Sequence, residues 1–135
     1  SEDCENEWES IRWRGAVTAA IRGKRGQQFL RELLAALEAM PNKRLITEEF
    51  EVNGQVCALG AIGRARQLSL QELDPDDHEK VATAFGIAPA LSREIMFEND
   101  EDFFASNETP EHRWSRMRQW VVSQLKQQTF ETLIP

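Results

Sequence analysis

Cysteine is scarce in the chain, and no long apolar run is present. Among 135 residues there are two cysteines, Cys4 in an acidic N-terminal segment and Cys57 in an apolar run. Neither belongs to a C-x-x-C pair, and two cysteines in such different settings do not make a disulfide scaffold. The sequence shows neither an apolar stretch long enough to span a membrane nor a basic-then-apolar leader at its N-terminus. We therefore expect a cytoplasmic protein without a membrane partner.

The chain also lacks a recognisable set of catalytic residues. Its two histidines, His78 and His112, each stand near the start of an expected helix among acidic residues, which is typical of surface or capping positions. Cys57 is expected to be a small buried apolar residue rather than a nucleophile. No nucleophile–base–acid set, metal-ligand cluster or pair of carboxylates stands out. The sequence therefore predicts a protein that is not an enzyme and that needs no metal or cofactor.

Charge is abundant in the chain and unevenly distributed. The 16 basic and 23 acidic residues give a net charge of -7. This acid excess argues against a general nucleic-acid binder, because such binding depends on Lys and Arg neutralising phosphates. Residues 12–44, however, contain eight basic and two acidic residues, whereas residues 72–80 and 94–111 are strongly acidic. A local anion site therefore remains open.

The length fits one domain over residues 1–135, and 41% of the residues are apolar. The spacing of these residues predicts a mainly α (α+β) fold, a compact multi-helix domain with one small antiparallel β-hairpin. Residues 1–8 are expected to form a frayed acidic terminus and residues 128–135 a C-terminal tail. Helices are predicted from apolar spacing and capping residues over 11–21, 27–40, 79–85, 89–98 and 110–127.

The hairpin is predicted at about residues 45–59, around the pair Asn53-Gly54. Asn-Gly between two alternating apolar runs favours a type I′ turn, because both central residues of that turn need a positive φ. With a two-residue loop, Val52 lies opposite Gln55, and Phe50 lies opposite Cys57. An isolated hairpin is only marginally stable, so its apolar face is expected to rest on helices. That face would comprise Ile46, Phe50, Val52, Cys57 and Leu59.

The small residues of segment 58–67 have two interpretations. Gly60 and Gly63 fit a helix that packs tightly through its glycines. The alternative is a phosphate-binding turn, because two arginines follow, although both the P-loop ending and the three-glycine dinucleotide spacing are absent.

Segment 81–98 looks like a helix-turn-helix with its turn at Gly86. A DNA-reading helix would present basic and amide side chains to base edges and phosphates. The second helix of this segment offers only Arg93, followed by acidic residues that phosphate would repel. The sequence therefore favours a helix-turn-helix that only packs within the domain over one that reads DNA.

Two groups of charged residues are candidates for binding. The basic group either pairs with the acidic blocks of the same chain or forms an anion site beside the start of helix 27–40. The acidic group lies around the loop after helix 89–98, where exposed phenylalanines would be unfavourable unless they are buried or bound. Such a surface suits docking onto a basic protein. The candidate anion-binding residues are Arg22, Lys24, Arg25, Arg31, Arg64 and Arg66. The candidate partner-binding residues are Glu98, Asp100, Glu101, Asp102, Phe103 and Phe104.

Several segments together carry a resemblance to a known group of proteins. They are RGKRGQQFLRELL at 22–34, Pro41 with KRLI at 43–46, VCALGA at 56–61, FGI at 85–87, ND at 99–100, ETP at 108–110 and RW at 113–114. This pattern resembles a family of small proteins encoded by phages and prophages, from which no activity can be carried over. The resemblance implies a mobile-element origin and the cytoplasm of a bacterial host.

The leading hypothesis is a non-enzymatic phage accessory protein that binds and inhibits a host component, such as a defence system. Its partner would be a host protein with a basic surface. The alternative from another class is a protein that binds a small anionic ligand such as a nucleotide. A DNA-binding regulator acting through residues 81–98 is the third hypothesis, and nucleic acid is otherwise not an expected partner. The sequence leaves self-association open.

Overall fold

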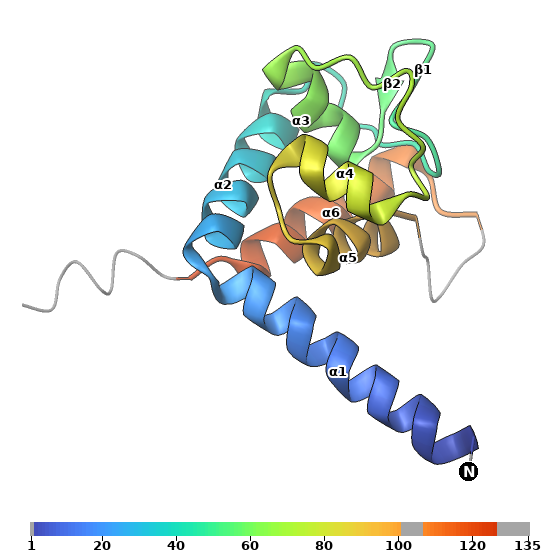
Figure 1. The fold of residues 1–135 in the computed structure, drawn as a ribbon. Coiled ribbons are helices and arrows are strands. Elements are labelled where there is room, and N and C mark those ends of the chain that lie inside the picture. Colours follow the sequence, from blue (N-terminus) through green and yellow to red (C-terminus); the bar gives the residue numbers. More distant parts are fainter. Residues whose placement is uncertain (1, 101–106, 127–135) are drawn as a thin grey trace, which may run out of the picture.

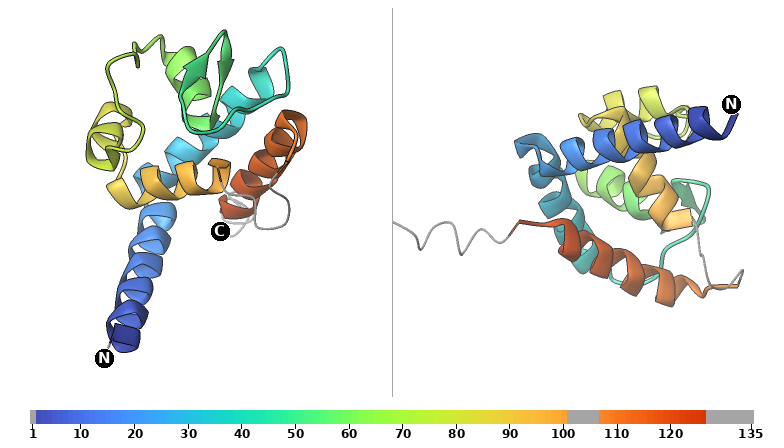
Figure 2. Two further views of the ribbon diagram at one scale, coloured as in Figure 1. Left: turned by 90° about the vertical axis from the view of Figure 1, so that its right-hand side faces the viewer. Right: turned by 90° about the horizontal axis from the view of Figure 1, so that it is seen from below.

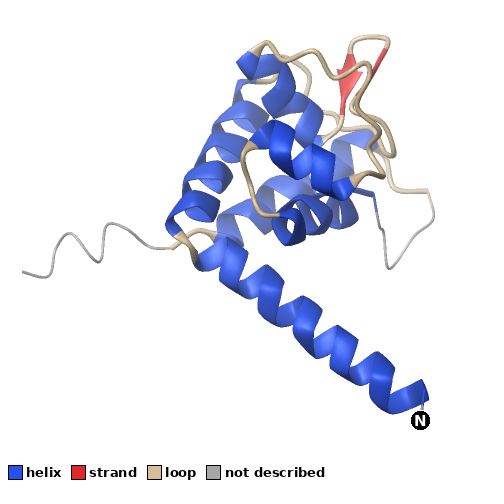
Figure 3. Cartoon of the chain, in the orientation of Figure 1, coloured by secondary structure: helices blue, strands red, loops and turns tan. Residues whose placement is uncertain are grey.

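The computed structural model describes residues 2–100 and 107–126, with side chains described from Glu7 onward (Figure 1). Within this part the chain forms six helices and one two-stranded antiparallel sheet, which confirms a mainly α domain with a small hairpin (Figure 3). The predicted tail at 128–135 lies outside the described residues. In chain order the elements are α1 (Glu2–Arg22), α2 (Lys24–Ala39), β1 (Glu51–Val52), β2 (Gln55–Val56), α3 (Ala58–Arg66), α4 (His78–Phe85), α5 (Pro89–Asp100) and α6 (Pro110–Gln124).

The hydrophobic core lies between the helices that follow α1. Helix α2 contacts α3 and α6, and α5 contacts α1, α3, α4 and α6. On α2 the residues Leu30, Leu33 and Leu37 are fully buried, at the i, i+3, i+7 spacing of one helix face. Met117 and Val121 on α6 are fully buried in the same way. The stripe predicted for helix 27–40 is therefore the one that faces the core.

The hairpin turn is confirmed, but its strands are shorter than expected. Asn53 and Gly54 have φ values of 53° and 81°, and Val52 pairs with Gln55 in the predicted register. Each strand, however, has only two residues, because α3 begins at residue 58 and the chain leaves the sheet. The prediction that Val52 lies on the buried face is wrong, since it is 39% exposed beyond the edge of the core.

Segment 58–67 forms a helix and not a phosphate-binding turn. The first backbone N–H groups of α3 are already bonded within the chain. Ala58 N donates to Asn99 Oδ1 at 3.0 Å, and Gly60 N donates to Cys57 Sγ at 3.4 Å. A Cβ at Gly60 would lie 2.0 Å from the carbonyl oxygen of Phe50, so the hairpin can sit on α3 only because this residue has no side chain. The expectation of a helix packed through its glycines is thus confirmed.

Helix α1 is longer than predicted. The helix begins at Glu2, so residues 2–8 are helical where a frayed segment was expected. Its C-terminal half packs through Val17 and Ile21 on the rest of the molecule, and its contacts are with α2 and α5. The N-terminal half extends away from the other helices (Figure 2).

Helix α4 ends at Gly86, where the turn was predicted, and this residue adopts a left-handed conformation with a φ of 73°. On α5, Leu91 and Ile95 are buried among the neighbouring helices. The exposed Arg93 lies over the ring of Trp13, with its guanidinium carbon 4.7 Å from the ring centroid. Because α5 is covered by four helices, it is not free to enter a DNA groove, and the geometry favours packing as the role of this segment.

Candidate functional site

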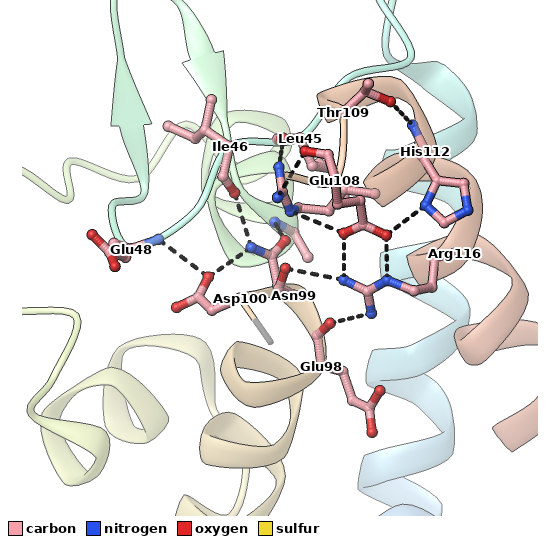
Figure 4. A network of polar contacts seen from close by, with 12 residues as sticks. Leu45, Ile46, Glu48, Glu98, Asn99, Asp100, Glu108, Thr109, His112 and Arg116 are labelled. Atoms are coloured by element: carbon pink, nitrogen blue, oxygen red, sulfur yellow. Dashed lines mark hydrogen bonds and ion pairs between the residues drawn. The ribbon is translucent and has the colours of Figure 1, made fainter. Parts of the chain in front are cut away.

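The acidic loop between α5 and α6 is fixed at both ends by buried polar contacts. Its central residues, Glu101, Asp102, Phe103 and Phe104, lie outside the described residues. The flanking residues are described, and Figure 4 shows how they join the end of α5, the approach to the hairpin and the start of α6. The site is built from these two anchors.

Asn99 forms the first anchor, at the end of α5. The residue is 1% exposed. Its side-chain oxygen accepts from Ala58 N at 3.0 Å, and its amide nitrogen donates to the carbonyl oxygen of Ile46 at 2.9 Å and to Asp100 Oδ1 at 2.8 Å. The same Asp100 oxygen accepts from Glu48 N at 3.1 Å. Both polar atoms of this buried amide thus form hydrogen bonds, and they tie the end of α5 to both sides of the hairpin.

Glu108 forms the second anchor, just before α6. Its side chain is 1% exposed, and Arg116 donates to both carboxylate oxygens, from Nε at 2.8 Å and from Nη2 at 2.9 Å. The ring of His112 contacts the same carboxylate through Nδ1 at 2.6 Å, and Arg113 Nε lies 3.4 Å from it. The hydrogen bonds from Arg116 and His112, with the charges of Arg116 and Arg113, hold the pKa of Glu108 below its ordinary value.

Arg116 also joins the two anchors to each other. It donates to the carbonyl oxygen of Glu98, and through Nη2 to that of Asn99 at 3.3 Å. One guanidinium therefore binds the last turn of α5 on one side and the carboxylate of Glu108 on the other. Its planar set of five donors makes this double contact possible. The loop is consequently closed at its base by a side chain from α6.

The start of α6 is fixed by a capping residue and a proline. Thr109 caps the helix, with its hydroxyl accepting from His112 N at 3.1 Å, and Pro110 takes the first helical position. A carboxylate at Glu108 also suits the positive end of the helix dipole. The side chain of His112 is exposed in the first turn of α6, and its ring contacts Glu108.

Only two of the six candidate partner-binding residues are described, and they differ in availability. Asp100 accepts hydrogen bonds from its own chain, so it belongs to the anchor. Glu98 is partly exposed, and burial together with the nearby charge of Glu94 raises its pKa above the ordinary value. Glu94 is 2% exposed and pairs with Arg14. Glu98 is therefore the described carboxylate that remains available beside the loop.

The candidate anion-binding residues do not form one site. Arg66 makes a two-point contact with Glu32, both distances 2.6 Å, and donates to the carbonyl oxygen of Phe85 at 3.0 Å. This contact lowers the pKa of Glu32 and raises that of Arg66. Arg64 donates to Gly54 O at 2.6 Å and to Glu51 at 3.2 Å. Both arginines are therefore used inside the chain.

The remaining basic residues lie around the junction of α1 with α2 and along α2. Arg22, Lys24 and Arg25 are exposed, and within the described part of the chain none of them forms an ion pair. Arg31 lies almost two turns further along α2 than Lys24 and is partly buried. A cavity of about 340 Å³ lies beside this junction. Arg14, Arg22 and Lys126 line it together with Glu94 and Glu98.

Sequence reasoning missed the residues that build the anchors. Asn99 and Glu108 stood out only as parts of the resemblance, and Arg113 and Arg116 were not assigned to a site. Their contacts join positions far apart in the sequence, such as Asn99 to Ile46. The one local signal is that two arginines follow Glu108 on a helix whose first turn lies beside it.

A comparison of the chain with protein-family models, curated proteins and solved structures finds no match. Among the described residues, no three or more His, Cys, Asp or Glu side chains gather as they would around a metal ion. The described helices include none with the length and apolar character needed to cross a membrane. The functional assignment therefore depends on the geometry of the site.

Proposed function

We propose that the protein is a non-enzymatic accessory protein of a phage or other mobile element that binds and blocks a protein of its bacterial host. The binding surface in this proposal is the acidic loop between α5 and α6. The observation that supports it is the double anchor at Asn99 and Glu108, closed by Arg116. Fixing both ends of a segment lowers the conformational entropy that the segment loses when a partner binds it.

The composition of the loop defines the chemistry of the partner. Aromatic side chains are frequent anchors of protein interfaces when a pocket takes them out of water. The neighbouring carboxylates would meet a basic surface and would steer the encounter. The proposed partner is therefore a host protein with Lys and Arg around an apolar pocket, and one that normally binds nucleic acid fits this description. Blocking such a surface would make the protein an inhibitor of that host function, including a defence function.

The test compares two pairs of variants in quantitative capture from a host lysate, followed by binding to the purified partner. Phe103→Ala/Phe104→Ala removes the two aromatic side chains, and Glu101→Ala/Asp102→Ala removes two charges. Each pair is expected to weaken binding at least about tenfold. The charge variant is expected to lower mainly the association rate, and the aromatic variant to raise mainly the dissociation rate.

Glu72→Ala/Glu79→Ala is the matched control, because it removes two exposed acidic residues from the other acidic block. It should bind like the wild type. If the captured protein binds equally well to both loop variants, or if no host protein is enriched, the proposal is refuted. If the control loses as much binding as the loop variants, the interaction depends on net charge alone, and the proposal is refuted as well.

A second candidate function, binding of a small anionic ligand, is favoured by one observation. Arg22 is exposed, has no ion pair among the described residues, and lines the cavity shared with Arg14 and Lys126. A thermal-shift series with nucleotides and inorganic phosphate tests this function. Stabilisation that disappears in Arg22→Ala would support it, and a flat series would remove it.

A further inference from the structure

Helix α1 carries apolar residues on two opposite sides. One side holds Trp13, Val17 and Ile21 and packs against the rest of the molecule. The other holds Trp8 and Ile11, each 62% exposed. Residues three apart lie on the same side of a helix, whereas residues two apart, such as 11 and 13, point in nearly opposite directions. The second side therefore cannot reach the core of its own chain.

Gly15 continues this exposed side, one turn beyond Ile11. A Cβ at Gly15 would meet nothing within 4 Å, so no packing inside the described chain requires a glycine here. Glycine in the middle of a helix weakens it. A residue without a side chain in line with Trp8 and Ile11 is what the close approach of a second helix would use. Positions 8, 11 and 15 also have the alternating spacing of three and four that is typical of a helix-pairing seam.

The charges along α1 specify how a second copy of this helix would lie. Residues 2–9 contain five acidic and no basic residues, and Arg12 and Arg14 follow them. A parallel pair would place acid beside acid and base beside base. An antiparallel pair would place the acidic half of each helix beside the arginines of the other. Glu7 and Arg12 are exposed, and neither has an ion pair within the described residues.

We infer that two copies of the chain associate through the exposed sides of α1, as an antiparallel helix pair. Trp8 of each copy packs beside Ile11 of the other copy. Arg12, which has no ion pair among the described residues, then lies beside the acidic first turns of the other copy. Gly15 gives the start of the other helix room to approach closely. The two seams are the same surface on both copies, so the pair closes with two-fold symmetry and does not extend into a filament.

The shape of the molecule allows this pairing. The N-terminal half of α1 extends away from the other helices, and its contacts with α2 and α5 use the opposite side (Figures 1 and 2). In an antiparallel pair the two bodies lie at opposite ends of the helix pair and on its outer sides. The dimer therefore forms without rearrangement of the described fold.

Analytical ultracentrifugation of the full chain tests the association. The wild type is expected to dimerise with a dissociation constant of about 10–100 μM, in line with a seam of two helices. Trp8→Glu and Ile11→Asp should weaken it at least about tenfold. Because both side chains are exposed, the helical circular dichroism of these variants should stay unchanged at low concentration. Val122→Asp, at a residue of α6 that is 44% exposed, is the matched control and should dimerise normally.

Spin labels measure the direction of the pair. Ala19→Cys in a Cys4→Ser background carries the label on an exposed position of α1. At 1.5 Å per residue, the antiparallel pair places the two labels about 30 Å apart, whereas a parallel pair places them about 10 Å apart. A wild type that stays monomeric at about 1 mM, a dimer that Ile11→Asp leaves intact, or a short label distance would each overturn the inference.

Discussion

At the scale of single residues, the clearest contrast in the molecule is between two helical glycines. Gly60 lies against the backbone of Phe50, and Gly15 has open space where a Cβ would be. The same substitution is therefore expected to have opposite effects at the two positions. The difference comes from what lies next to each glycine, because both are inside helices.

Gly60→Ala is expected to lower the free energy of unfolding by about 3 kcal/mol, because a backbone carbonyl cannot move aside as a flexible side chain can. Gly15→Ala is expected to raise it by about 0.5–1 kcal/mol, from helix propensity alone. Urea denaturation at low protein concentration measures both, with each variant the control for the other. A Gly60→Ala protein as stable as the wild type would contradict the packing of the hairpin on α3.

Cys57 combines a capping role with complete burial. Its sulfur accepts from Gly60 N, and burial raises the pKa of the thiol to about 12. The thiolate, which is the reactive form, is then nearly absent at neutral pH. Iodoacetamide at pH 8 should leave Cys57 unmodified in the folded chain and modify it in guanidinium, as peptide mapping would show. Rapid labelling of Cys57 in the native protein would contradict its placement in the core.

At the scale of helices and loops, the anchor around Glu108 predicts a specific dependence of stability on pH. The folded pKa of Glu108 lies below its ordinary value of 4.5, so the carboxylate stabilises the fold above that value. This contribution is lost as the pH falls through the lowered folded pKa. Glu98 has the opposite sign, because its folded pKa is raised. Its favourable contribution is present below 4.5 and is lost as the pH rises through the folded pKa.

Glu108→Gln is expected to lower the free energy of unfolding at pH 7 by about 2–3 kcal/mol, because it leaves two arginines without their shared carboxylate. Its stability should also fall less steeply than that of the wild type as the pH drops below 4.5. Glu98→Gln is the matched control at the other end of the loop, and it should be at least as stable as the wild type at pH 7. Chemical denaturation across this pH range measures both effects. If the free energy of unfolding falls equally steeply below pH 4.5 in Glu108→Gln and the wild type, the stabilising role of the Glu108 carboxylate is refuted.

Local patterns predicted most of the helices, because these patterns act within a few residues. The leucines of α2, the Thr109-Pro110 start of α6 and the turn at Gly86 each follow from spacing or capping within one segment. The extent of α1 did not follow, since its apolar residues lie on two opposite sides and give no single stripe. The shortness of the hairpin depends on where α3 begins. Neither of these features is encoded in the local alternation of apolar residues.

The candidate site was less predictable than the fold for the same reason. The acidic, aromatic character of the loop is visible in the sequence, but its anchors require α5, the hairpin approach and α6 to meet. Arg116 contacts the carbonyl of Asn99, 17 positions earlier, and only the packed fold brings them together. Likewise, the pairing of Arg66 with Glu32 across 34 positions removes it from the predicted anion site.

At the scale of the whole molecule, charge is sorted along the chain more than it is balanced overall. The net charge of -7 describes neither the exposed bases at the junction of α1 with α2 nor the change of sign along α1 itself. Because the sign of the charge changes along α1, two copies of this helix attract each other when they lie antiparallel and repel each other when they lie parallel.

Self-association links stability to concentration, because a dimer that forms only between folded chains stabilises the folded state by mass action. Raising the wild-type concentration about 100-fold should raise its Tm by about 2–5 °C, and the Tm of Ile11→Asp should not change with concentration.

The dependence of the dimer dissociation constant on salt shows whether the charges of the two helices attract or repel each other. Going from about 0.05 to 0.5 M NaCl screens exposed charges, so it should weaken an antiparallel dimer and strengthen a parallel one. A wild-type Tm that does not change with concentration, or a dimer that tightens with salt, would contradict the antiparallel pairing of α1.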